Sequence, residues 1–157
     1  MSFCLILLAA GNSKRFSHKI PKPFIKVAGR TILELSLLKF KNISQIKNII
    51  VVTNKKHQKF IKTIKSQKFI KMTGGKTRQE STLKALRYIK RNQIKCSKVL
   101  IHDSARPNFS LQLIKTIINK SKKNTVVPKI PVNDALKLMI NKNELSNLTR
   151  EKFFLTQ

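Results

Sequence analysis

Strand-like and helix-like segments alternate along the chain, and this alternation restricts the folds that it can adopt more than any other feature. Short runs of mainly leucine, isoleucine and valine occur at residues 3–9, 48–53, 68–72, 98–102 and 125–128. Segments with helical apolar spacing lie between or after them, near residues 31–41, 55–66, 77–90 and 110–118. Repeated β-α-β units form largely parallel sheets with helices on both faces. The sequence therefore predicts an α/β fold.

Three of the predicted helices begin at capping residues. Thr31-Ile-Leu-Glu34 and Thr77-Arg-Gln-Glu80 have the spacing of a capping box, in which the hydroxyl and the carboxylate each satisfy a backbone N–H group. Ser110 is the expected cap of the last helix. In the helix after Thr77 we expect an inward face formed by Leu83, Leu86 and Ile89 or the stem of Lys90.

The pattern changes after Pro131. Two apolar stretches, 136–140 and 145–148, flank a polar turn and predict a β-hairpin arm over about residues 132–150. Residues 152–157 predict the start of a further strand with no turn or cap to close it. We therefore expect residues 1–157 to form a single domain that is incomplete at its C-terminus.

The composition is strongly basic, with 34 lysine and arginine residues, six acidic residues and a formal net charge of +28. Such a charge is typical of nucleic-acid-binding proteins. However, lysine is spread along the whole chain and aromatic residues are few, so no platform for stacking bases is evident. A general bias toward lysine, isoleucine and asparagine explains the charge without any selected partner, and we do not expect a nucleic-acid partner.

Cysteine use and hydropathy indicate a cytoplasmic protein. Cys4 and Cys96 have neither the spacing of a metal site nor that of a disulfide framework, which favours a reducing compartment. The apolar run at residues 3–10 is too short for a membrane span, and no basic stretch precedes it as in a signal peptide. We expect no contact with a membrane.

Three polar loops, at about residues 9–22, 74–81 and 103–107, each follow a predicted strand. Ligands of parallel sheets bind beyond the carboxyl ends of the strands, so these loops are expected to converge. In the first, Gly11 permits a positive φ and Lys14, Arg15 and Lys22 add positive charge. It matches neither the Walker nor the Rossmann glycine pattern.

The second loop has paired glycines before a capped helix, an arrangement that can bind an anion or a base. In the third, Asp103 and Arg106 could hold a metal and a phosphate together. Taken singly, each loop is equally well a structural turn. We expect His57 to be solvated among lysines and His102 to point away from Asp103, and no covalent nucleophile is evident.

Together the three loops resemble those of the 2-C-methyl-D-erythritol 4-phosphate cytidylyltransferase family. The matching segments are Ala9-Ala10-Gly11-Asn12-Ser13-Lys14-Arg15 with Pro21-Lys22, Gly74-Gly75-Lys76-Thr77-Arg78-Gln79-Glu80-Ser81, and His102-Asp103-Ser104-Ala105-Arg106-Pro107. The first motif occurs in many sugar-nucleotide transferases, whereas all three in this order are much more specific. The resemblance spans essentially the whole chain and implies a Rossmann-like, mostly parallel sheet with a projecting hairpin arm.

The resemblance also implies an activity: transfer of CMP from CTP to 2-C-methyl-D-erythritol 4-phosphate, with release of pyrophosphate, in non-mevalonate isoprenoid synthesis. It assigns the stabilisation of charge on the α-phosphate to Arg15 and Lys22, and neutralisation of the triphosphate to Mg²⁺. It places cytosine and ribose against the backbone of Ala10, Gly11 and Gly75 and the side chain of Ser81.

For the acceptor, the resemblance implies that Asp103 lies near the metal and the acceptor hydroxyls and that Arg106 orients the acceptor. Arg150, on an arm exchanged between two subunits, would meet the acceptor phosphate, which implies a homodimer.

Three departures from the family pattern bear on these expectations. Asp134-Ala135 stands where the family has Asp-Thr, and Lys76 stands where an acidic residue is common. The sequence stops at Gln157, before the family's Thr-Pro-Gln segment and the later threonine and lysine that complete the acceptor-phosphate site. We therefore expect the 157-residue piece alone to have little or no activity.

Three alternatives remain open at this point. Ribitol-5-phosphate cytidylyltransferase shares all three motifs, and Asp103-Ser104 and Asp134-Ala135 are compatible with it. A basic nucleic-acid-binding protein without catalysis would fit the charge. The complete protein could also be bifunctional, with a cyclodiphosphate synthase following the present end.

Overall fold

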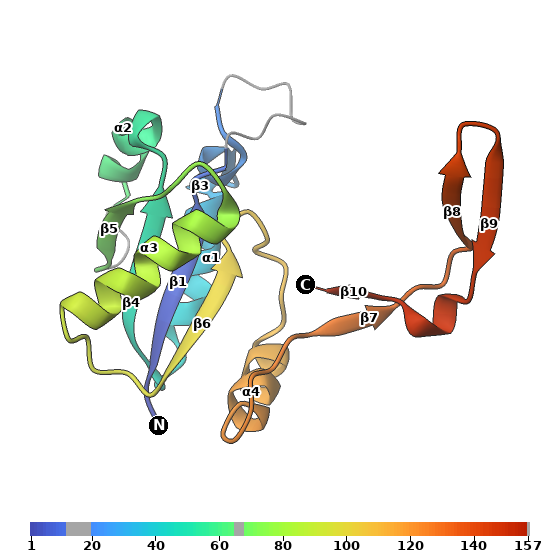
Figure 1. Cartoon of the computed structure of the whole chain (residues 1–157). Helices are drawn as coiled ribbons and strands as arrows, with labels where there is room; N and C mark the ends of the chain where they lie inside the picture. Colours follow the sequence, from blue (N-terminus) through green and yellow to red (C-terminus); the bar gives the residue numbers. More distant parts are fainter. Residues whose placement is uncertain (12–19, 65–67, 157) are drawn as a thin grey trace. The chain divides into compact units, whose positions relative to one another are not determined.

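The computed structural model describes residues 1–11, 20–64 and 68–156 of the chain (Figure 1). They form two compact units, Met1–Phe109 and Ser110–Gln157, each of which is described by itself. Within the described residues, no helix is long and apolar enough to cross a membrane.

The first unit is built on a four-stranded parallel sheet. Its strands are β1 (Phe3–Ala9), β4 (Ile46–Thr53), β5 (Ile70–Thr73) and β6 (Lys98–Asp103), in the order β5-β4-β1-β6. Strand β1 is central and pairs in parallel with both β4 and β6. The predicted parallel α/β sheet is therefore confirmed, and its first strand is almost wholly buried.

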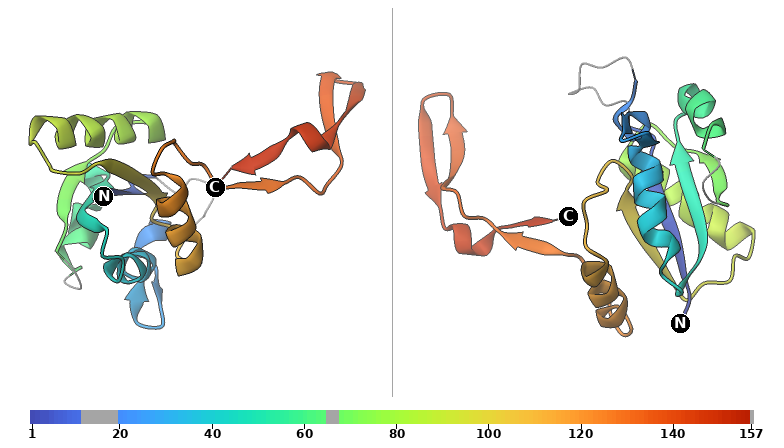
Figure 2. Two further views of the ribbon diagram at one scale, coloured as in Figure 1. Left: turned by 90° about the horizontal axis from the view of Figure 1, so that it is seen from below. Right: turned by 180° about the vertical axis from the view of Figure 1, so that it is seen from behind.

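Helices cover both faces of this sheet, with α1 (Ile32–Lys41) on one face and α3 (Arg78–Arg91) on the other (Figure 2). Successive side chains of a strand point to opposite faces. Cys4 and Ile6 of β1 accordingly belong to one core cluster with Ala85 and Ile89 of α3. The intervening Leu5 and Leu7 are also fully buried, as are Leu33 and Leu37 of α1. Burial on both faces explains why β1 is a continuous apolar run.

The inward face of α3 differs from the prediction. Leu83 and Leu86 are exposed, and the buried residues of this helix are Ser81, Ala85 and Ile89. These three are spaced four residues apart and therefore form one stripe along the helix. Serine and alanine are small, so this stripe lets the helix axis come close to the sheet, which the larger leucine side chains would prevent.

Helix capping follows the sequence at α1 and only partly at α3. At α1, Thr31 Oγ1 accepts from the Glu34 N–H at 3.2 Å and Glu34 Oε2 accepts from the Thr31 N–H at 2.8 Å, a complete capping box. At α3, Thr77 Oγ1 accepts from the Glu80 N–H at 3.0 Å. The Glu80 carboxylate instead accepts from the Lys76 N–H at 2.7 Å, which lowers the pKa of Glu80.

Short elements surround these helices: the 3₁₀ turn η1 (Lys22–Phe24), strands β2 (Lys26–Val27) and β3 (Arg30–Thr31), the 3₁₀ turn η2 (Lys55–His57) and helix α2 (Gln58–Lys62). The helix predicted near 55–66 is thus shorter and begins with a 3₁₀ turn.

The prediction that His57 is solvated is wrong. His57 is 8% exposed and its ring lies against those of Phe24 and Phe60, at centroid distances of 5.8 and 6.5 Å. Its burial lowers the pKa of the imidazole, because burial disfavours the charged form.

The second unit contains α4 (Leu111–Lys120), β7 (Lys129–Pro131), β8 (Leu136–Asn141), β9 (Glu144–Leu148), the 3₁₀ turn η3 (Arg150–Lys152) and β10 (Phe154–Thr156). Strands β8 and β9 form the predicted antiparallel hairpin. The strand predicted at 125–128 is absent. β7 begins instead at Lys129, which pairs with Thr156 of β10 in an antiparallel register.

Candidate functional site

The carboxyl ends of the four parallel strands border a cleft of about 1040 Å³. All three loops predicted to converge contribute to it. Its lining residues are Leu8, Ala9, Ala10, Gly11, Lys22, Pro23, Asn54, Lys55, Thr73, Gly74, Gly75, Lys76, Thr77, Arg78, Ser81, Asp103, Ala105 and Arg106. Seven of the nine residues singled out from the sequence therefore lie around one cavity: Ala10, Gly11, Lys22, Gly75, Ser81, Asp103 and Arg106.

The first loop contributes its two ends to the cleft. Ala10 and Gly11 follow β1, and Lys22 starts the turn η1. Lys14 and Arg15 lie outside the described residues. Gly11 does not have the positive φ that the sequence allowed, and an added Cβ there would meet no atom of the described residues within 4 Å. This open space leaves room for a ligand to approach the backbone closely.

The second loop is held tightly in place by Ser81. The Ser81 hydroxyl accepts from the Gly75 N–H at 3.0 Å and donates to the Thr77 carbonyl at 2.8 Å. An added Cβ on Gly74 would lie 2.7 Å from Ser81 Oγ and 3.0 Å from Ala10 Cβ. The glycine is thus needed for close contact between loops, and the hydroxyl proton of Ser81 is already engaged.

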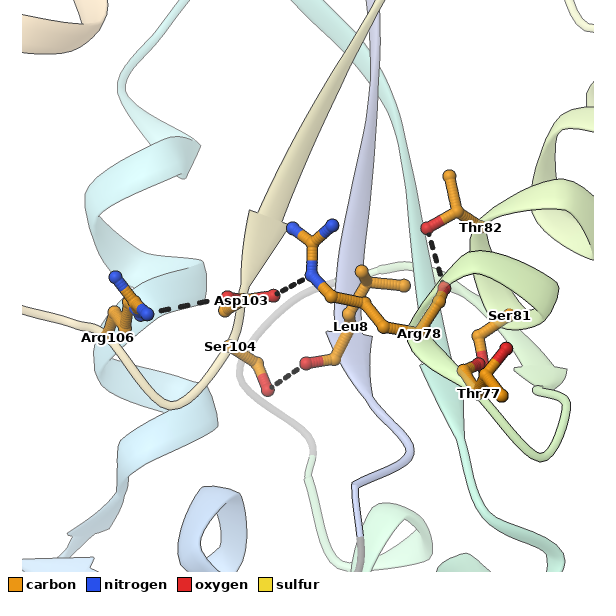
Figure 3. A network of polar contacts seen from close by, with 8 residues as sticks. All are labelled: Leu8, Thr77, Arg78, Ser81, Thr82, Asp103, Ser104 and Arg106. Atoms are coloured by element: carbon orange, nitrogen blue, oxygen red, sulfur yellow. Dashed lines mark hydrogen bonds and ion pairs between the residues drawn. The ribbon is translucent and has the colours of Figure 1, made fainter. Parts of the chain in front are cut away.

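The third loop begins with Asp103, whose carboxylate lies between two arginines (Figure 3). Arg78 Nε donates to Asp103 Oδ1 at 3.1 Å, and Arg106 Nε lies 3.6 Å from Asp103 Oδ2. Arg78 was part of a motif in the sequence but was assigned no role. Its position in the first turn of a helix that follows a glycine loop was the available signal, whereas its partner was not readable from the sequence.

Ser104 ties the third loop to the first strand, another contact that the sequence did not reveal. Its N–H and its hydroxyl both donate to the Leu8 carbonyl, at 3.1 and 2.8 Å. The Ser104 carbonyl accepts from the hydroxyl of Ser36, on α1, at 2.9 Å. Both serines are fully buried, so these bonds fix the ends of β1 and β6 relative to each other.

The cleft is strongly positive. The part of its lining that the structure describes contains five cationic side chains, Lys22, Lys55, Lys76, Arg78 and Arg106, and one carboxylate, Asp103. Among the described residues, no group of three or more histidine, cysteine or acidic side chains could hold a metal ion. This charge favours a polyanionic ligand such as a polyphosphate.

His102 turns to the opposite side of the strand from its neighbour, as expected. It packs against Phe40 and Phe109, and its Nε2 lies 3.0 Å from the Arg106 carbonyl. Burial lowers the pKa of this imidazole. Its contacts support the fold of the third loop rather than the cleft.

Arg150, the remaining predicted site residue, belongs to the second unit. Its guanidinium donates to the Asn133 carbonyl at 2.8 Å and lies 3.6 Å from Glu151. The side chain thus joins the two ends of the segment that carries the hairpin β8–β9.

Comparisons with known proteins found relatives that match almost the whole chain. A family model described as 2-C-methyl-D-erythritol 4-phosphate cytidylyltransferase matches residues 3–156. The bifunctional enzyme IspD/IspF of Pelagibacter ubique is 44% identical over 158 residues, covering 100% of this chain and 42% of that protein. The 2-C-methyl-D-erythritol 4-phosphate cytidylyltransferase of Thermosipho melanesiensis is 35% identical over 142 residues, covering 87% of this chain and 62% of its own length.

A solved structure shows the same fold. The bifunctional IspDF from Campylobacter jejuni matches 100% of this chain and 39% of its own, with a TM-score of 0.81 and 30% identity. The chain thus spans between about two fifths and three fifths of the length of the relatives described here.

Proposed function

The chain belongs to the 2-C-methyl-D-erythritol 4-phosphate cytidylyltransferase family, and from this membership we propose that the protein transfers CMP from CTP to 2-C-methyl-D-erythritol 4-phosphate. The observation that carries the proposal is the convergence of the three motif loops on one cleft, whose described lining has five cations and one carboxylate. We further propose that residues 1–157 act as one nucleotidyltransferase domain, of which the segment 132–150 is the arm.

In the proposed reaction, an oxygen of the acceptor phosphate attacks the α-phosphorus of CTP. The bond from that phosphorus to the β-phosphate oxygen breaks, and pyrophosphate leaves. Reactions of this kind depend mainly on positioning and on electrostatic stabilisation. We assign that stabilisation to Lys22, which lines the cleft, and to Arg15.

The nucleoside would be held by the first two loops. Backbone groups of Ala10, Gly11 and Gly75 border the cleft, where the open space at Gly11 suits close approach. Because the Ser81 hydroxyl already donates to Thr77, its role toward cytosine is limited to accepting a hydrogen bond and to holding the loop.

A magnesium ion bound here would take most of its ligands from phosphate oxygens. Asp103 is the one carboxylate in the described lining of the cleft, and Mg²⁺ commonly uses one or two carboxylates together with substrate phosphates. When bound, the ion would neutralise the charge of the triphosphate. The surrounding lysines and arginines would share that task.

For the acceptor, we propose contacts with Asp103 and Arg106 in the cleft and with Arg150 of a second subunit. The hairpin supports a homodimer, because Leu138, Met139, Ile140 and Leu145 are exposed on it. The cytoplasm is the proposed location, and neither a membrane nor nucleic acid is a proposed partner.

Pyrophosphate release by the natural full-length protein tests this function. With CTP and 2-C-methyl-D-erythritol 4-phosphate we expect turnover, and Lys22→Ala should lower kcat by about 100-fold or more, the usual loss when one preorganised charge-stabilising group is removed. Lys47→Ala, at the exposed amino end of β4, is the matched control and should keep the wild-type rate. A preference for ribitol 5-phosphate, or a Lys22→Ala variant with wild-type kcat, would contradict the proposal.

A further inference from the structure

The carboxylate of Asp103 is held by two arginines that come from different loops. Arg78 is the first residue of α3 and forms a hydrogen-bonded ion pair with one carboxylate oxygen at 3.1 Å. Arg106 lies in the loop after β6, and its Nε is 3.6 Å from the other oxygen. Figure 3 shows the carboxylate between these two guanidinium groups. The closer contact, with Arg78, fixes the direction in which Oδ1 points.

The backbone that carries Arg78 is itself fixed. Its carbonyl accepts from the Thr82 hydroxyl at 2.9 Å, and the preceding Thr77 is the N-cap of the helix. The Ser81 hydroxyl donates to the Thr77 carbonyl at 2.8 Å. The guanidinium therefore projects from a well-anchored helix start toward the end of β6.

The ion pair contributes little to stability. The side chains of Arg78 and Asp103 are 62% and 33% exposed, and water and salt screen the attraction between exposed charges. Stabilisation of the fold is thus a weak explanation for this contact. Its position between the second and third loops, both of which line the cleft, points to a role in the site.

We propose that Arg78 is a positioning residue for Asp103. It holds the carboxylate in the orientation that receives the acceptor hydroxyls, and without it the carboxylate turns toward Arg106 alone. The inference rests on the proposed function, because it assigns the acceptor to Asp103. It also links the loop proposed for the nucleotide to the residue proposed for the acceptor.

The test is a double-mutant cycle on pyrophosphate release by the natural full-length protein, with Arg78→Gln, Asp103→Asn and the combined variant. Arg78→Gln should lower kcat/KM for the acceptor by about tenfold or more, as a misplaced group in a site does. Since Arg78 acts through Asp103, the combined variant should be no worse than Asp103→Asn alone. Arg78→Lys keeps one charged donor and should restore part of the loss.

Arg87→Gln, on the exposed side of the same helix, is the matched control and should keep the wild-type kcat/KM. The melting temperature of Arg78→Gln should match that of Arg87→Gln. Additive losses in the cycle would show that Arg78 contacts substrate directly, and an Arg78→Gln variant as active as Arg87→Gln would leave it no role; either result overturns the inference alone. A wild-type protein without turnover would overturn the proposed function and this inference with it.

Discussion

Two cysteines that are distant in the sequence lie together in the folded protein. Cys4 is fully buried in β1, and Cys96 packs against the core cluster that contains it. Burial and the neighbouring Cys96 thiol raise the pKa of the Cys4 thiol to about 12. Cys4 is therefore protonated at any physiological pH and is a poor nucleophile.

Cys4 is buried whereas Cys96 is partly exposed, and this difference in exposure predicts selective alkylation. With iodoacetamide at about pH 8, Cys96 should be modified in the native protein, whereas Cys4 should react only after denaturation. Peptide mass spectrometry after timed quenching measures both sites. Cys96→Ser is the control, because it should leave the native protein unmodified, and rapid native labelling of Cys4 in that variant would contradict the pKa.

Single side chains mark the limit of what the sequence could predict. Lys22 and Asp103 were found because both belong to motifs, Asp103 at the end of β6 and Lys22 at the start of the turn η1, and both line the cleft. His57 was misjudged because its burial comes from Phe24 and Phe60, which lie outside its own run of lysines. The partner of Arg78 is 25 residues away along the chain, and no local pattern specifies such a pair.

At the scale of elements, the glycine loop depends on the elements packed around it. The Gly74 N–H donates to the Thr53 carbonyl at the end of β4, at 2.8 Å. An added Cβ would lie within 3.0 Å of atoms from Ala10, Val52 and Ser81. Three elements thus meet at a residue that has no side chain.

Gly74→Ala is expected to destabilise the protein by about 1–3 kcal/mol, because inserting a methyl group into a packed region forces its neighbours apart. Urea denaturation followed by circular dichroism gives the change in the free energy of unfolding. Gly11→Ala is the matched control, since its added methyl would meet none of the atoms in the described part of the chain within 4 Å. Equal stability of the two variants would show that the close contact at Gly74 is relaxed in solution.

Strands proved more predictable than the faces of helices. β1 and β4 are long apolar runs because both of their faces are buried, so composition alone located them. The inward face of α3 could not be read from its leucines, because the sheet selects the small residues Ser81 and Ala85 for close packing. Likewise β7 is defined by its pairing with β10 and not by the valines that precede it.

For the whole molecule, the dominant electrostatic effect is repulsion among its many positive side chains. The chain carries a formal charge of +28, and four ion pairs occur within the residues that the structure describes. Net charge far from zero destabilises a compact state, and salt screens that repulsion.

The melting temperature should therefore rise when NaCl is increased from about 20 mM to about 300 mM, where the Debye length is several-fold shorter. Differential scanning fluorimetry measures the change. A variant with Lys122→Gln and Lys123→Gln, both exposed after α4, should melt higher at low salt and respond less to NaCl. A melting temperature that falls with added NaCl would contradict net repulsion.

The central place of β1 also determines when its two edges can be paired during synthesis on the ribosome. Its neighbour β4 is complete at Thr53, but its other neighbour, β6, ends at Asp103. At a synthesis rate of about 5–20 residues per second, translation of β6 is completed roughly five to twenty seconds after translation of β1. During that time an apolar strand has an open edge that can pair with other chains. We therefore expect the growing polypeptide to aggregate more readily before Ser104 is translated and can bond to Leu8.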